Sequence, residues 1–153
     1  MFFDLALTYD KDARSCDLTL GDDCDLAIDT TSLPAVLLSV GLDRRAAPDD
    51  ELPEGRSQML APLSFSERRG CPGDGLDPFG EMTGSRLWLL DRAKQSEQTR
   101  QMTEYWLAES LAWAQPETGI APEIEVEWLR RNVLGYRVLV ADGSVSLSRR
   151  VGD

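Results

Sequence analysis

Residues 123–150 decide the fold class, and they read EIEVEWLRRNVLGYRVLVADGSVSLSRR. Apolar and polar residues alternate in three successive runs of this stretch. Alternation with a period of two is typical of antiparallel strands that place one face on a core and the other in solvent. The dipeptide Asp142-Gly143 predicts a two-residue hairpin turn between the last two runs. We therefore expect three antiparallel strands in this part of the chain.

The N-terminal stretch predicts a second set of strands. Apolar side chains occupy every odd position from Phe3 to Tyr9, which indicates a half-buried strand over residues 2–10. Shorter alternating runs follow at residues 16–20 and 26–28, separated by turn-forming aspartates and a glycine. This pattern predicts a small antiparallel β-meander.

A helical period replaces the strand period after the meander. From Leu33 to Arg45 the apolar residues recur at every third or fourth position, so we expect a first helix there. Thr31 or Ser32 can act as its N-cap. Gly41 is expected to weaken this helix without ending it.

Two further helices are predicted in the second half of the chain. A dense apolar cluster at residues 87–90 is expected to open the second helix, and Ser96 is expected to cap a third helix that ends at Pro116. More than half of the circumference of the third helix is apolar, which indicates a central core helix: Met102, Tyr105, Trp106, Ala108, Leu111, Ala112 and Trp113. Core packing is the simplest role for three of the tryptophans, with an interface as the alternative for part of the set: Trp88, Trp106 and Trp113.

Residues 46–84, between the first and second predicted helices, have a different composition. They contain five of the eight prolines and six of the twelve glycines. A stretch of this length without regular structure is either a disordered insertion or an extended arm that orders on a partner. Five apolar residues could anchor such an arm: Met59, Leu60, Leu63, Phe65 and Phe79. The order of the predicted strands and helices along the chain indicates one α+β domain over residues 1–153. In this domain the arm separates the first helix from the other helices.

The charge and the residue types exclude several function classes. The net charge is −11, and the basic residues are Arg apart from Lys11 and Lys94. Clustered basic residues that would bind nucleic acid or an anionic membrane are absent. The chain has no His and only three scattered cysteines, so we expect neither a metal site nor a cofactor.

One enzymatic alternative stays open at this point. A pair of carboxylic acids at a set separation can hydrolyse a glycosidic bond, and an acidic chain offers candidates in Glu67, Glu81 and the row Glu123, Glu125, Glu127. The row lies on the polar phase of a predicted strand, which favours a solvent or interface face. A small carboxylate-dependent glycoside hydrolase is therefore the less favoured hypothesis.

Several segments together resemble a known family. They are DLALTYD at residues 4–10, DLAIDTTSLPAVLLSVGLDRRAAPDDELP at 25–53, GSRLWLLDRAKQSEQT at 84–99, ESLAWA at 109–114 and IEVEW at 124–128. In this order they resemble the Mu-like phage tail baseplate wedge proteins, which are distant kin of the T-even baseplate wedge protein that starts the tail sheath. The resemblance spans nearly the whole chain. It implies a structural, non-enzymatic protein of the virion, assembled in the cytoplasm of a bacterial host.

The arm departs from that family at one motif. The family usually carries a sequence like RRGWWGD, whereas residues 68–74 read RRGCPGD here. The framing residues are kept, and the two aromatic residues are replaced by Cys71 and Pro72. This arm could therefore meet a different partner surface.

The resemblance implies contacts with other baseplate wedge proteins, with the sheath protein and with tube or hub proteins. The edge expected to accept a strand from a neighbour is the last strand, residues 145–151, or the first, residues 2–9. We expect no catalytic, cofactor-binding or metal residues. The candidate partner-binding residues come from the arm and from the last strand: Phe65, Arg68, Arg69, Phe79, Ser146, Ser148, Arg149 and Arg150.

Overall fold

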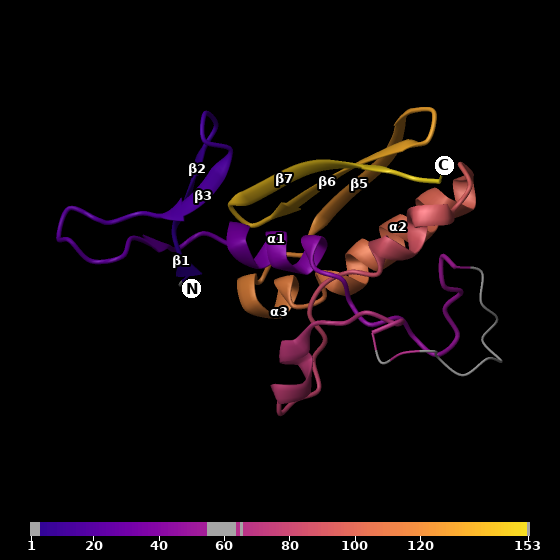
Figure 1. Cartoon of the computed structure of the whole chain (residues 1–153), viewed down its shortest axis with the longest axis horizontal. Helices are drawn as coiled ribbons and strands as arrows, with labels where there is room; N and C mark the ends of the chain where they lie inside the picture. The colour runs from indigo at the N-terminus through magenta and orange to yellow at the C-terminus, as the bar shows by residue number, and fades with distance from the viewer. Residues whose placement is uncertain (1–3, 55–63, 65, 153) are drawn as a thin grey trace.

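The structure is a computed structural model that describes residues 4–54, 64 and 66–152 of the 153-residue chain. It has a mixed α+β architecture, with short antiparallel strands first, helices in the middle and a three-stranded antiparallel sheet last (Figure 1). The predicted fold class is confirmed. We call residues 4–29 the N-terminal lobe and the described residues from 33 to 152 the body.

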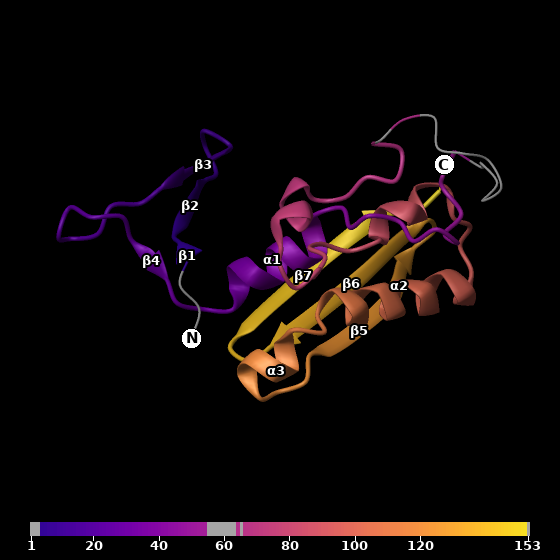
Figure 2. The ribbon, with the colours of Figure 1, turned by 90° about the horizontal axis from the view of Figure 1, so that it is seen from below.

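The lobe consists of four short strands in two antiparallel pairs. Strand β1 (Asp4–Leu5) pairs with β4 (Ile28–Asp29), and β2 (Leu7–Asp10) pairs with β3 (Ser15–Leu18). The predicted short antiparallel strands are thus confirmed, although β1 pairs with β4 rather than with its neighbour in the sequence as in a simple meander. The expectation of a half-buried first strand is wrong, because every residue of β1, β2 and β3 is exposed. The lobe stands out from the body, and no helix covers either of its faces (Figure 2).

The C-terminal sheet has the order β5-β6-β7, with β5 over Glu123–Arg130, β6 over Val133–Val140 and β7 over Gly143–Arg150. The three predicted strands are confirmed. Helices lie against one face of this sheet, and the other face is bare (Figure 1, Figure 2). Alternate residues form the face toward the helices, as their cross-strand pairing shows: Ile124 with Val138, Val126 with Tyr136, Trp128 with Leu134, Val138 with Val145, and Tyr136 with Leu147.

The turn between β6 and β7 lies one residue earlier than predicted. Val140 pairs with Gly143, so the loop residues are Ala141, at φ 49°, and Asp142. Gly143 is instead the first residue of β7, where an added Cβ would lie 2.8 Å from the Ser32 Oγ. The glycine is needed because the start of the first helix packs against this turn.

Helix α1 (Leu33–Gly41) is shorter than predicted and ends at Gly41 rather than at Arg45. The chain then becomes extended, and Asp43 forms a parallel bridge with Ser85. Ser32 occupies the N-cap position without a capping bond; its Oγ donates to the Val140 carbonyl at 2.9 Å instead. Both differences arise because tertiary partners compete with the local helical signal.

The other predicted helices are also modified. Residues 87–90 lie in a 3₁₀ helix, η2 (Leu87–Arg92), rather than in an α-helix. Helix α2 (Glu97–Ser110) begins as predicted, with the Thr99 N–H donating to the Ser96 Oγ at 3.1 Å. It ends before Pro116, which lies inside a separate short helix, α3 (Ala114–Thr118). Proline is tolerated there because the first helical turn needs few N–H donors.

The core of the body lies between the sheet and the helices. Trp88 and Trp106 are buried, and Trp113 packs against the core with its indole N–H donating to the Ser39 Oγ at 2.8 Å. Met102 and Tyr105, expected to face the core, are exposed on α2. The buried apolar set includes residues from all the long elements of the body: Val36, Val40, Leu87, Leu90, Leu107, Leu111, Val126, Leu134, Val138, Val140 and Val145. Across the described residues, no helix is long and apolar enough to cross a lipid bilayer.

Candidate interaction surfaces

Strand β7 forms one edge of the C-terminal sheet, and hydrogen-bond alternation fixes the direction of its amides. A two-residue hairpin loop is closed by a hydrogen-bonded pair, here Val140 with Gly143, and such pairs alternate along an antiparallel ladder. The amides of three alternate residues therefore point away from β6: Ser144, Ser146 and Ser148. In the part of the chain that the structure describes, no backbone bond joins β7 to any segment other than β6. The predicted residues Ser146 and Ser148 thus lie on an open edge.

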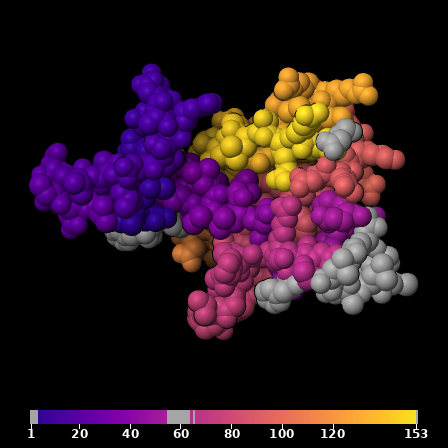
Figure 3. Space-filling view, in the orientation of Figure 1, coloured from indigo at the N-terminus to yellow at the C-terminus, as the bar shows by residue number. Residues whose placement is uncertain are grey.

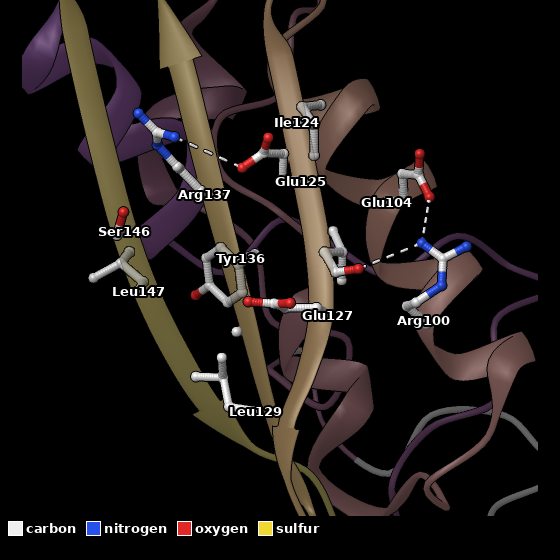
Figure 4. Close-up of a pocket in the computed structure, with 12 residues that line it drawn as sticks. Arg100, Glu104, Ile124, Glu125, Glu127, Leu129, Tyr136, Arg137, Ser146 and Leu147 are labelled. Carbon is white, nitrogen blue, oxygen red and sulfur yellow. Dashed lines mark hydrogen bonds and ion pairs between the residues drawn. The ribbon is translucent and has the colours of Figure 1, made fainter.

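The opposite edge of the sheet, formed by β5, is partly occupied. Helix α2 packs along β5, and the Arg100 guanidinium donates to the Val126 carbonyl at 3.5 Å (Figure 4). Arg100 also pairs with Glu97 and Glu104 on its own helix, at 2.7 and 2.9 Å. The two edges therefore differ, because an arginine of α2 bonds to the backbone of β5, whereas no described segment other than β6 forms a backbone bond with β7.

A hollow of about 620 Å³ lies over the sheet between β5, β6 and β7 (Figure 4). It contains the predicted row members Glu125 and Glu127, and the Glu125 carboxylate lies 3.8 Å from the Arg137 guanidinium. Leu129 folds over Gly135, where an added Cβ would lie 2.7 Å from the leucine side chain. The Glu row is therefore the polar side of a strand, as expected from the alternation.

The carboxyl groups whose pKa departs from the ordinary value are Asp10, Asp29 and Glu97. Backbone hydrogen bonds from Ala13 and Asp12 lower the pKa of Asp10, and the side chain and amide of Thr31 lower the pKa of Asp29. The Arg100 guanidinium lowers the pKa of Glu97. No three His, Cys, Asp or Glu side chains within the described ranges are grouped so as to hold a metal ion.

The two arginines at the end of β7 have different surroundings. Arg149 is partly buried, and its Nη2 donates to the Asp91 carboxylate at 2.7 Å. Arg150 is exposed beside the open edge. Arg150 is thus available to a neighbouring molecule, whereas Arg149 already links β7 to the end of η2.

The two predicted arginines of the arm contact the chain itself. The Arg68 guanidinium donates to the carbonyls of Ala47 and Pro48. The Arg69 guanidinium lies 4.5 Å from the centre of the Trp88 ring and 2.6 Å from the Asp43 carboxylate. These contacts hold the two sides of the arm together at its base, and partner binding by either arginine stays a prediction.

The apolar anchors predicted in the arm have mixed outcomes. Phe79 is 87% exposed and follows the 3₁₀ helix η1 (Pro72–Leu76), whose Leu76 is equally exposed. The segment that contains η1 projects from the body (Figure 1). Four of the anchors lie outside the described residues: Met59, Leu60, Leu63 and Phe65.

Sequence reasoning missed the ion cluster that fixes the described start of the arm. Arg86 is buried, and its guanidinium lies 2.9 Å from the Asp50 carboxylate and 2.8 Å from the Glu109 carboxylate. Burial opposes the charge on Arg86, but the hydrogen bonds outweigh it and raise its pKa. Asp50 is 36 residues from Arg86, so no local pattern could reveal the pair.

Comparisons with known proteins add an independent line of evidence. The family model described as "Phage protein GP46" matches residues 33–146. A protein of Escherichia phage Mu, described as "Baseplate protein gp46", is 31% identical over 127 residues, which cover 81% of this chain and 80% of that protein. No solved structure matches the chain.

Proposed function

The chain belongs to the phage protein GP46 family, and from that membership we propose that it is a wedge protein of a contractile-tail baseplate that starts the sheath. Its similarity to a baseplate protein supports a structural role in the virion. The proposed role is carried by protein–protein contacts and involves no catalysis. Its partners are other wedge proteins, the sheath protein and the tube or hub.

The open edge of β7 is the observation that supports this role most directly. Three outward amides and their carbonyls repeat along β7, and the side chains beside them are short serines that hinder an incoming strand little. An extended segment that adds to a sheet edge gains a ladder of backbone hydrogen bonds. A free protein normally blocks such an edge, whereas an assembly can use it.

Charge supports a defined register for the incoming strand. Arg150 lies exposed at the end of β7, and it would meet an acidic side chain of the added strand. A surface pair of this kind contributes only about 0–1 kcal/mol, so it sets the register rather than the affinity. The first subunit of the sheath is the proposed source of that strand.

A proline scan of β7 tests the proposal. Ser146→Pro removes an outward N–H from the open edge and leaves the bonds to β6 in place. We expect tails that carry Ser146→Pro to have complete baseplates and no extended sheath, as judged by electron microscopy. Ser146→Ala keeps the amide and is the matched control, so its tails should resemble wild type.

The folded state of the variant must be measured in parallel. The unfolding midpoint of isolated Ser146→Pro protein should stay near that of Ser146→Ala, because the edge position accommodates a proline. Full-length sheaths on tails that carry the proline would show that β7 is not the docking edge. Cell-wall hydrolysis by the purified protein, lost in Glu125→Gln, would favour the hydrolase hypothesis instead.

A further inference from the structure

The N-terminal lobe exposes a concentration of large apolar side chains that the sheath contact does not use. Seven of them are between 39% and 65% exposed: Leu5, Leu7, Tyr9, Leu18, Leu20, Leu26 and Ile28. Single exposed leucines are ordinary on protein surfaces, but a contiguous apolar patch marks a contact site.

The pairing of the lobe places these side chains on one face. Directly opposed residues of an antiparallel pair share a face, and here the opposed pairs are Leu5 with Ile28, Leu7 with Leu18 and Leu20 with Leu26. Residues two apart on a strand also share a face, which adds Tyr9 to this set. The other face carries Thr8, whose hydroxyl bonds to that of Thr19. The lobe therefore has one apolar and one polar face.

Nothing in the described chain covers the apolar face. Every hydrogen bond of residues 4–29 that involves described residues stays within residues 4–31. The lobe projects from one end of the body in the space-filling view (Figure 3), and its apolar side chains keep 39% to 65% of their surface exposed. Paired strands of this size are marginally stable in water unless another layer packs on them. The lobe thus has the form of half a sandwich.

The charge of the lobe indicates what the other half is. Residues 4–29 contain eight aspartates and only two basic residues, Lys11 and Arg14. We propose that the apolar face docks on a different protein of the tail, one whose apolar surface is rimmed by Arg or Lys. A second copy of this chain is disfavoured as the occupant, because two strongly acidic lobes would repel each other.

This contact is separate from the proposed sheath contact. The lobe lies wholly outside residues 33–146, which the family model matches, whereas the outward serines Ser144 and Ser146 lie inside that range. The inference rests on the chain being a baseplate component, but not on the use of the β7 edge. The two sites can therefore be broken one at a time.

Site-specific photo-crosslinking in assembled tails tests the docking. A benzophenone amino acid replaces Leu7 on the apolar face or, as the matched control, its neighbour Thr8 on the polar face. We expect the Leu7 probe to link this chain to a different tail protein, at a surface site with Arg or Lys nearby. The yield should exceed that of the Thr8 probe severalfold, because the Leu7 position faces the docked partner and the Thr8 position lies on the opposite face.

Variants extend the test to apolar contact and charge. Leu18→Ser should lower the Leu7 crosslink, whereas Ile120→Ser, at a residue of similar exposure on the body, should leave it unchanged. Asp12→Lys reverses one charge in the turn between β2 and β3, at the end of the apolar face, and should also lower the yield. Circular dichroism of each isolated variant checks that the body remains folded.

Several results would overturn the inference. Equal yields from Leu7 and Thr8, or a crosslink from Leu7 to the body of its own chain, would show that the face is not a docking site. The Leu7 probe could instead link to a second copy of this chain, and the free protein could form a dimer that Leu18→Ser dissociates. Those two results together would show that the apolar face binds another copy rather than a basic partner. Ser146→Pro tails separate the two proposals, because loss of the sheath there should leave the Leu7 crosslink intact.

Discussion

The N-terminal lobe and the C-terminal sheet share one sequence pattern and have opposite environments. In both, apolar residues alternate with polar ones along antiparallel strands. Leu134 in β6 is fully buried, whereas Leu7 in β2 is 65% exposed. Alternation thus states which side chains share a face, but not whether anything covers that face. The cover comes from α1 and α2, which lie against the C-terminal sheet and leave the lobe free (Figure 2).

The largest expected effect comes from the covering layer itself. Trp106 lies on α2, the helix that packs along β5, and is 6% exposed. Trp106→Ala should lower the free energy of unfolding by about 3–5 kcal/mol, the usual cost of a large core truncation. Urea denaturation of the isolated protein measures it. An unchanged midpoint would mean that Trp106 serves an interface and that the sheet is covered by something else.

A matched pair of leucines compares the two regions directly. Leu134→Ala in the C-terminal sheet should cost about 2–5 kcal/mol, because it opens a cavity in the core. Leu7→Ala in the lobe should change the free energy of unfolding by no more than about 0.5 kcal/mol. Both values come from the same urea titration. Similar losses at the two positions would show that the lobe is covered in the free protein.

A matched pair of glycines repeats the comparison at the turns. Gly143→Ala places a Cβ 2.8 Å from the Oγ of buried Ser32, which is held by bonds to Val140 and Asp142, so we expect a cost of about 1–3 kcal/mol. Gly21→Ala in the lobe meets only the exposed Asp23 carboxylate at 2.9 Å, which can rotate away. Its effect should stay within about 0.5 kcal/mol. Thermal unfolding of the two variants ranks them.

The smallest expected effect is a difference between the lobe and the C-terminal sheet in how their stability changes with pH. Hydrogen bonds lower the pKa of Asp10 and Asp29 in the lobe, so their contribution to stability is present above pH 3.8 and is lost as the pH falls below it. Burial raises the pKa of Tyr136 in the sheet above 10.0, so its contribution is present below that pH and is lost as the pH rises. Chemical shifts of lobe amides should move on the acid side, and those of β6 amides on the alkaline side. Asp10→Asn should remove the contribution of Asp10 to the acid-side change, and Tyr136→Phe should remove the alkaline-side change of the β6 amides.

The sequence predicted the strands and helix positions, because these depend on local period. All three C-terminal strands, the short N-terminal strands and the Ser96 cap follow from spacing alone. The errors occur where distant residues compete with a local signal. Ser32 gives its hydroxyl to β6 rather than to its helix, and the chain after Gly41 pairs with Ser85. The sequence around Ser32 and Gly41 does not indicate those distant partners.

The candidate partner residues also differ in how much of their environment the sequence alone reveals. Alternation alone predicts that Ser146 and Ser148 share one face of the last strand, whereas the outward direction of their amides follows only from the pairing of β7 with β6. The contacts of Arg69 with Asp43 and Trp88, and that of Arg149 with Asp91, could not be foreseen, because they join residues that are far apart in the sequence. The exposed face of the lobe was missed for the opposite reason. Its pattern is that of a buried strand, and only the fold shows that the helices lie elsewhere.

The shared carboxylate of Asp91 has a mechanical consequence. Its Oδ1 lies 2.7 Å from Arg149 on β7, and its Oδ2 lies 3.7 Å from Arg69, which stacks on Trp88. A pulling force on β7 would therefore be distributed beyond the strand to η2 and to the base of the arm. Asp91 thus joins the sheet edge to η2 and to the base of the arm through ionic contacts that lie outside the packed core.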